Sequence, residues 1–224
     1  MIETLRNSAA HVIVNNLHHI DLDDADAHHI FRVLRVRDGQ LVTATDGAGH
    51  WRECRVVGRD ALEPTSAINE IAAPRYRVGV AFVPVKAEKP ETTVKQLVEI
   101  GIDDIIVLLP ILRSVAGSRD RLEERVARLV REACMQSRRV HIPVVRLGVA
   151  LNEVTPNKTA AVADPAGGKL LPTHQLIIVG PEGGFASEEL PTRTQLVGIG
   201  PMVMRAETAS LVAGARLVAL RERQ

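Results

Sequence analysis

The residues Ile178-Val179-Gly180-Pro181-Glu182-Gly183-Gly184-Phe185 join an apolar strand directly to a glycine-rich loop. Three glycines in five residues let the backbone approach a ligand closely and adopt positive φ. Ser187 follows, where it would cap a short helix with Glu188 and Glu189 in its first turn. Because ligands of open parallel sheets bind beyond the carboxyl ends of the strands, this is a candidate binding loop. A tight turn that binds nothing is the alternative interpretation.

A second segment, Gly198-Ile199-Gly200-Pro201-Met202-Val203-Met204-Arg205-Ala206-Glu207-Thr208-Ala209, repeats the order of strand, Gly-Pro and helix start. Arg205, Glu207 and Thr208 are polar residues at the point where the loop becomes a helix. Helix capping with a surface ion pair would also explain them. Since both loops follow predicted strands in the same way, we expect them to face one another and form one pocket.

The rest of the chain places these loops in an α/β domain. Helices are predicted at 90–100, 118–138 and 206–223, and strands at 77–83, 104–109, 159–163, 175–179 and 196–199. Strands that alternate with helices indicate a parallel sheet. Upstream, strand-like runs at 40–45 and 52–57 flank turn signals, and a helix is predicted at 24–34. We therefore predict a small β-barrel over 1–72, a linker at 72–74 and an α/β domain over 73–224.

Composition narrows the class of protein. The 224 residues are 46% hydrophobic and 25% charged, which is typical of a folded domain. Apolar runs such as 105–110 are far shorter than the ~20 residues of a membrane span. The sequence does not open with a basic segment followed by an apolar core, so no signal peptide is expected. Cys54 and Cys134 are too few for a disulfide scaffold, and a cytoplasmic location is therefore expected. The tandem pairs His18-His19 and His28-His29 are poor metal clamps, and no metal is expected.

The net charge of +1 conceals an uneven distribution. Residues 1–72 carry seven Arg and eleven acids, or −4, whereas residues 113–146 carry nine Arg and four acids, or +5. A basic segment on a neutral protein indicates a local anionic partner such as an RNA backbone. A general preference of this protein for arginine is the alternative. Aromatic residues are only 2%, which argues against a stacking platform built from several aromatic rings.

Three motifs stand out, Gly-Pro-Glu-Gly-Gly at 180–184, Gly-Pro-x-x-x-Arg-x-Glu-Thr-Ala at 200–209, and Glu-Ala-x-x-Gln-Ser-x-Arg at 132–139. Together they resemble the ribosomal RNA small-subunit methyltransferase E family, which belongs to the SPOUT class of knotted methyltransferases. The segment 28–35 is similar to the family's His-x-x-x-Val-Leu-Arg in a PUA-like barrel. Glu99-Ile100-Gly101-Ile102 and Arg113-Ser114 match two further family segments. The chain departs from the family at Lys95-Gln96, Arg138, Met202 and Ala206.

The resemblance implies a methyltransferase that modifies N3 of a uridine in 16S ribosomal RNA near the decoding centre, with S-adenosylmethionine as the methyl donor. It also implies a trefoil knot and a homodimer, with 16S rRNA or the small ribosomal subunit as partner, no DNA and no membrane. For the cofactor we expect Ile178, Gly180, Pro181, Gly183, Ile199, Gly200, Met204, Arg205 and Thr208. For the RNA we expect Arg32, Arg35, Arg113, Ser114, Arg138 and Arg139, with Arg37 and Arg119 beside them.

The chemistry of this reaction suggests roles for three residues. The pKa of the uridine N3 proton lies roughly two to three units above neutral, so its removal costs about 3–4 kcal/mol. Arg205 would stabilise the negative charge on the uridine, and Glu207 or Glu182 would accept the proton or orient Arg205. Two other functions are considered, a SPOUT methyltransferase of another RNA, for example a tRNA 2′-O-methyltransferase, and an RNA-binding assembly factor that has lost methyl transfer.

Overall fold

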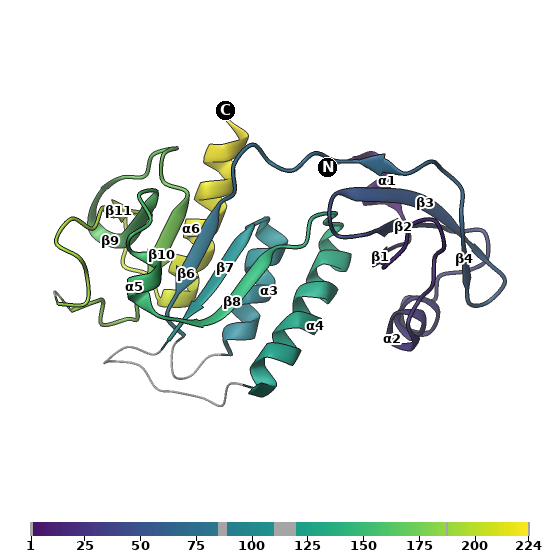
Figure 1. Ribbon diagram of the computed structural model, residues 1–224, viewed down its shortest axis with the longest axis horizontal. Helices are drawn as coiled ribbons and strands as arrows, with labels where there is room; N and C mark the ends of the chain where they lie inside the picture. Colours follow the sequence, from purple (N-terminus) through teal and green to yellow (C-terminus); the bar gives the residue numbers. More distant parts are fainter. Residues whose placement is uncertain (1, 85–88, 110–119, 187, 224) are drawn as a thin grey trace. The chain divides into compact units, whose positions relative to one another are not determined.

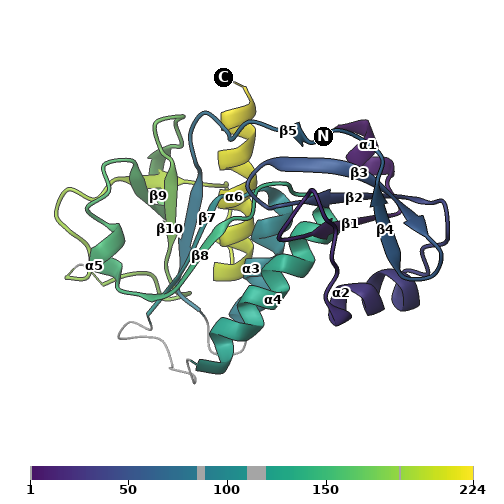
Figure 2. The same ribbon diagram turned by 45° about the vertical axis from the view of Figure 1, so that its right-hand side comes forward.

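The computed structural model describes residues 2–84, 89–109, 120–186 and 188–223, with side chains from 123 onward in the third range. The chain forms two compact units. The first comprises Met1–Pro74 and Arg131–Ile142, and the second comprises Arg75–Val130 and Pro143–Gln224. Figures 1 and 2 show the elements of each unit.

The first unit is built on a mixed β-sheet. Its elements are α1 (Glu3–Asn7), β1 (Ala10–Ile13), α2 (Asp24–His28), the π-helix η1 (His29–Val33), β2 (Leu41–Thr45), β3 (His50–Val57), β4 (Ala61–Pro64) and β5 (Asn69–Glu70). The strands pair in the order β1-β2-β3-β4, and β5 also pairs with β3. Only the pair of β1 and β2 is parallel among these described strands. The helix predicted at 24–34 is confirmed, and it continues from α2 into the π-helical turn. A closed barrel stays a prediction.

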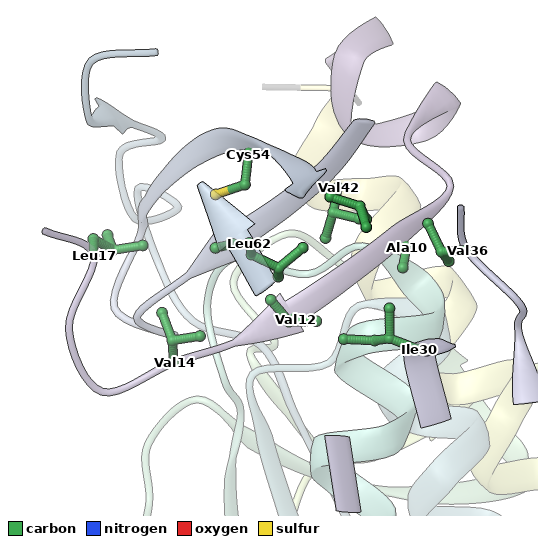
Figure 3. Packing of buried hydrophobic residues seen from close by; sticks show 11 residues of the cluster. Ala10, Val12, Val14, Leu17, Ile30, Val36, Val42, Cys54 and Leu62 are labelled. Atoms are coloured by element: carbon green, nitrogen blue, oxygen red, sulfur yellow. The ribbon is translucent and has the colours of Figure 1, made fainter. Parts of the chain in front are cut away.

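The core of the first unit is a cluster of small apolar side chains, which Figure 3 draws as sticks. Val12 of β1, Val42 of β2 and Cys54 of β3 are almost completely buried in it. β1 was missed in the sequence because its four residues are all buried. A strand buried on both faces lacks the alternation of apolar and polar residues that marks a half-buried strand.

Residues 131–142 lie in the first unit although they begin inside the long helix Asp120–Ser137, whose earlier residues lie in the second. The Gly49 amide donates to the Val140 carbonyl at 2.8 Å, and the Ile142 amide donates to the Gly47 carbonyl at 2.9 Å. These bonds attach the segment to the turn between β2 and β3. A linear boundary at residue 72 could not anticipate them, since the partners are far apart in the sequence.

The second unit holds a six-stranded sheet in the order β11-β9-β10-β6-β7-β8. Its strands are β6 (Gly79–Phe82), β7 (Asp104–Leu108), β8 (Val144–Val149), β9 (Ala160–Lys169), β10 (Leu176–Val179) and β11 (Leu196–Gly198). Every neighbouring pair is parallel, which confirms the predicted α/β class. Its helices are α3 (Pro90–Ile100), α4 (Asp120–Ser137), α5 (Leu151–Val154) and α6 (Ala206–Glu222). The three predicted helices are confirmed, and α5 was not predicted.

Helices α3 and α6 lie side by side against one face of this sheet (Figures 1 and 2). The helix α3 ends as predicted, at Gly101, whose φ of 101° is a left-handed cap. The opposite face carries a second apolar core that includes Ile106, Ile178 and Val154 of α5. No helix in the described ranges combines the length and the apolar character that crossing a membrane requires.

The short helix predicted after the first glycine-rich loop is wrong. Ser187, its expected cap, lies outside the described residues, and Glu188 and Glu189 lie in a turn. The carboxylate of Glu189 accepts from the Ala186 amide at 2.6 Å, and its own amide donates to the Ala186 carbonyl at 3.0 Å. The acidic side chain therefore closes a turn, where the sequence pattern indicated a helix start.

Candidate functional site

A cavity of about 510 Å³ lies in the second unit at the carboxyl ends of β10 and β11. The two glycine-rich loops line it with residues 179–186 and with residues 199–204 except Pro201. The loops meet because β9 pairs with β10 on one side and β11 on the other, and all three strands are parallel. The cavity has the volume usual for a small-molecule site. The two loops therefore form one pocket, as expected.

The structure places most of the expected cofactor residues in the wall of this cavity. Those that line it are Gly180, Pro181, Gly183, Ile199, Gly200 and Met204, together with the candidate catalytic residue Glu182. Three expected residues are not in the wall. Ile178 is completely buried in the core beneath it, while Arg205 and Thr208 are exposed at the start of α6.

The wall also contains residues that the sequence interpretation missed. Residues 162–165 line the cavity from the middle of β9, and Phe185, Ala206 and Ala209 complete it. β9 extends to Lys169, beyond the predicted end at 163. The signal was present in Asp164-Pro165, which follows an apolar strand just as the two glycine-rich loops do.

Gly180 and Gly200 each lie close to a side chain of their own loop. A Cβ on Gly180 would lie 2.8 Å from Cε2 of Phe185, and a Cβ on Gly200 would lie 2.8 Å from Cε of Met204. Both neighbours line the cavity. Each glycine therefore leaves room for a wall residue of its own loop, and a close approach of its backbone to a ligand stays a prediction.

The charged residues in the wall are acidic. Asp164 and Glu182 line the cavity, and the lining residues of the described chain include no Lys, Arg or His. Asp164 is partly buried, and its Oδ1 accepts from the Ala166 amide at 2.7 Å. Glu182 is exposed. This wall favours a cation and disfavours phosphate groups, which would meet like charge without compensation.

Arg205 stands beside this cavity as the N-cap residue of α6. Its side chain makes no capping hydrogen bond, and no ion pair joins it to Glu207 within the described part of the chain. Its carbonyl accepts from the Ala209 amide at 2.8 Å, which holds the backbone at the helix start. The guanidinium is exposed, so the alternative of a capping side chain with a surface ion pair is not observed.

Glu207, the other candidate proton acceptor, is half-buried and lines a small hollow between α6 and α3. Phe82 and Thr93 also line this hollow. Ala206 borders both the hollow and the large cavity. Glu182 and Glu207 therefore lie at two different openings, and both stay candidates.

The residues expected to bind RNA fall into three groups. Arg32, Arg35 and Arg37 are exposed on the first unit. Arg138 and Arg139 are partly buried there, where Arg138 donates to the Ser8 carbonyl at 3.0 Å and Arg139 to the His141 carbonyl at 3.1 Å. Burial lowers the pKa of Arg138 below its usual range. Arg113, Ser114 and Arg119 lie outside the described residues.

Metal ligation finds no support in the arrangement of side chains. Within the described ranges, no group of three or more His, Cys, Asp or Glu residues is placed to hold a metal ion. Cys54 and Cys134 are buried and free, and burial raises the pKa of each thiol to about 11. Both thiols are therefore protonated near neutral pH and suit packing rather than ligation.

Comparisons with known proteins agree with this arrangement. A family model described as an RNA methyltransferase domain matches residues 72–218, and one described as an RNA methyltransferase PUA domain matches residues 22–63. The ribosomal RNA small subunit methyltransferase E of Synechocystis sp. is 30% identical over 227 residues, which cover 91% of this chain and 74% of that protein. The protein of the same name from Mycobacterium bovis is 29% identical over 241 residues, which cover 95% of this chain and 87% of that protein.

The fold is similar as well. A solved structure of a ribosomal RNA small subunit methyltransferase E from Neisseria gonorrhoeae, bound to S-adenosyl methionine, is 25% identical with a TM-score of 0.74. The match covers 94% of this chain and 97% of that one. Sequence and fold thus agree over almost the whole length, and the chain belongs to the ribosomal RNA small subunit methyltransferase E family of RNA methyltransferases.

Proposed function

We propose that this protein transfers a methyl group from S-adenosylmethionine to N3 of a uridine in the 16S ribosomal RNA of the small subunit. The observation that carries the cofactor class is the charge of the cavity wall, which has two carboxylates and no cationic side chain among the described residues. A sulfonium cofactor is positively charged, whereas dinucleotides and nucleoside phosphates are anions that this wall would repel. The methyl transfer and the RNA substrate follow from membership of the family.

The wall suits such a cofactor in shape as well as in charge. Apolar side chains such as Val162, Leu196 and Ile199 can cover the adenine ring, while Asp164 and Glu182 can attract the positive charge. When bound, the cofactor supplies a methyl group on a sulfonium that is ready for in-line displacement. The loops at 180–186 and 199–204 would hold it in place, which is the contribution of position and orientation.

Arg205 is proposed to stabilise the developing negative charge of the uridine. Its exposed guanidinium makes no side-chain hydrogen bond or ion pair in the described part of the chain, so it is available for the carbonyl oxygens of the base. Glu182 from the wall of the cavity, or Glu207 from the adjoining hollow, would accept the N3 proton or orient Arg205. Both assignments remain in the proposal because Ala206, the first residue of α6, borders both openings.

The RNA is proposed to contact arginines. Arg32, Arg35 and Arg37 are the strongest candidates because they are exposed. Arg113 and Ser114 are also proposed contacts, because they resemble a motif of the family. Arg138 and Arg139 also remain proposed contacts, with part of each guanidinium already used inside the first unit. Phosphate contacts of this kind predict that RNA affinity falls steeply as salt rises. An affinity independent of salt would contradict this part.

A homodimer and a trefoil knot through the loops after β10 and β11 complete the proposal. At the rim of the cavity, Met202 is 72% exposed and Val203 is 83% exposed. Apolar side chains gathered at a binding site are the kind of surface that a substrate or a second subunit covers. Sedimentation that finds only a 24.4 kDa species at micromolar concentration would contradict the dimer.

The function is tested by two measurements. Calorimetry of the purified protein should show binding of S-adenosylmethionine, and mass spectrometry should find one uridine of 16S rRNA unmethylated in a strain without the protein. Expression of the wild-type chain should restore that methyl group, and expression of Arg205→Ala should not. If the rRNA of the deletion strain is unchanged while a tRNA loses a methyl group, the substrate in this proposal is wrong. Absence of cofactor binding would favour an assembly factor without methyl transfer.

A further inference from the structure

A second cavity, of about 350 Å³, lies in the first unit and has no part in the proposed methyl transfer. Three segments line it. The segment 15–18 follows β1, Asp46 follows β2 and His50 begins β3, and Ile68 precedes β5. Its volume lies within the range of small-molecule sites.

Two partly buried hydrogen bonds hold two of these segments in place. Arg52 of β3 donates to the Leu17 carbonyl at 2.7 Å and also to the Ser66 carbonyl. One guanidinium thus joins the segment after β1 to the segment before Ile68. Leu17 itself is anchored in the apolar core of the unit, where Figure 3 labels it. The cavity is therefore built on fixed backbone.

The third segment is fixed by Asp46. Its Oδ1 accepts from the amides of Ala48 at 2.8 Å and His50 at 3.2 Å, while its Oδ2 lies 2.7 Å from Nδ1 of His50. Burial alone would raise the pKa of Asp46, but the bonds from the Ala48 amide and from His50 outweigh it and lower the pKa. The ionised carboxylate takes up Nδ1, so the free hydrogen-bonding atom of the imidazole is Nε2.

The lining combines amide, imidazole and apolar groups. Oδ1 of Asn16 accepts from the His18 amide at 2.8 Å, which leaves the Asn16 NH₂ group as a donor. The side chain of Asn15 has no hydrogen-bond partner among the described residues. Leu17 and Ile68 add apolar surface, and no Lys or Arg is among the lining residues that the structure describes. This chemistry suits a planar heterocycle with a polar edge and is unsuited to a phosphate group.

We propose that this cavity binds one unpaired nucleobase of the RNA, other than the uridine that is methylated. The proposal rests on the RNA substrate of the proposed function. It is supported by the RNA methyltransferase PUA domain match over 22–63, which includes Asp46 and His50. Proteins that read single-stranded RNA receive splayed bases in this way, through hydrogen bonds to the base edge and contact with the ring face. The cavity would hold the base, and the exposed arginines Arg32, Arg35 and Arg37 would contact the RNA backbone elsewhere on this unit.

The test begins with free nucleosides and the full-length protein. Uridine, cytidine, adenosine and guanosine are titrated separately, and the histidine ring signals are followed by NMR, with inorganic phosphate as the comparison. The His50 signal should shift with at least one nucleoside and not with phosphate. The signal of His19, which is exposed and does not line the cavity, should stay in place. Equal shifts of both histidines, or a response to phosphate alone, would overturn the proposal.

The second part of the test measures affinity for a 16S rRNA fragment. Loss of one base contact reduces affinity by about fivefold or more. We therefore expect His50→Ala and Asn15→Ala each to weaken RNA binding by about that factor, with S-adenosylmethionine affinity unchanged. Asn15→Ala should fold like the wild type, because the Asn15 side chain makes no hydrogen bond among the described residues. A loss of RNA affinity in this variant therefore reports on the contact with the base. The matched control His19→Ala should bind RNA like the wild type.

The outcomes separate this inference from the proposed function. If His50→Ala and Asn15→Ala bind RNA like the wild type while the wild type methylates rRNA, the cavity proposal fails and the enzyme assignment stands. If the wild type does not bind the cofactor but the His50 signal still responds to nucleosides, the enzyme assignment fails and the cavity proposal stands. If His19→Ala loses as much RNA affinity as His50→Ala, the loss is a general effect of surface histidines. That result would also overturn the proposal that the cavity binds a base.

Discussion

Replacement of Asp164 by asparagine tests the charge argument for the cofactor cavity. The change removes one of the two negative charges of the described wall and keeps Oδ1 as an acceptor for the Ala166 amide. A sphere of about 510 Å³ has a radius of about 5 Å, so a wall carboxylate lies about 5 Å from a charge at the centre. With an effective dielectric constant of about 40–80, suited to a partly exposed group, Coulomb's law gives about 0.8–1.7 kcal/mol.

That energy corresponds to a loss of about 4- to 17-fold in the affinity for S-adenosylmethionine. S-adenosylhomocysteine lacks the sulfonium charge, so its affinity should change by less than about twofold. Isothermal titration calorimetry of both ligands, with wild type and Asp164→Asn, measures the two ratios. The control Glu182→Gln removes a more exposed carboxylate, where solvent screening is stronger, and should have a smaller effect. An equal loss for both ligands, or no loss for either, would refute the electrostatic reasoning.

Three further results are expected. Arg205→Ala should lower the single-turnover methylation rate by about 10²–10³ with cofactor affinity nearly unchanged, and a variant that keeps more than about a tenth of the rate would contradict the role of Arg205. Gly180→Val should abolish cofactor binding in a folded protein, because the valine side chain displaces the Phe185 ring into the cavity. Gly200→Ala meets only the flexible end of Met204, so its affinity for the cofactor should stay closer to that of the wild type. The contribution of His11 to the free energy of unfolding should fall by about 2.5 kcal/mol between pH 6.5 and pH 4, because burial lowers its pKa to about 4 and the unfolded chain therefore takes up the proton first. Urea denaturation across this pH range should show a smaller fall in His11→Asn.

The environment of His11 explains why that last effect depends on the fold. Its Nδ1 lies 2.8 Å from Oγ1 of Thr43, and its Nε2 lies 3.2 Å from the carbonyl of Arg139. Burial lowers the pKa, the bond to the Arg139 carbonyl opposes this, and the positive charge of Arg138 adds to the lowering. None of these neighbours is near His11 in the sequence. A histidine in a run of apolar residues indicates burial, but its titration is decided by tertiary contacts.

Local sequence determined the elements of the second unit and the position of the two loops. The ends of α3 could be predicted from the sequence, since Pro90 lies in its first turn and Gly101 is its left-handed cap. Both residues act through the backbone geometry of a few neighbouring residues. The alternation of strands with helices likewise predicted the parallel sheet. The Gly-Pro loops could be recognised because a strand end followed by glycine is a local pattern.

Only the tertiary structure decided what those loops surround. The order β11-β9-β10 brings Asp164 and the two loops to one cavity, and Phe185 explains why Gly180 cannot carry a side chain. The tertiary structure also decided that Ile178 lies in the core and that Arg138 donates to the Ser8 carbonyl within the first unit. It likewise placed Asp46 and His50 in the wall of another cavity. The physical reason is the same in each case. Strand pairing and side-chain packing join residues far apart in the chain, whereas a local pattern records only the preferences of neighbours.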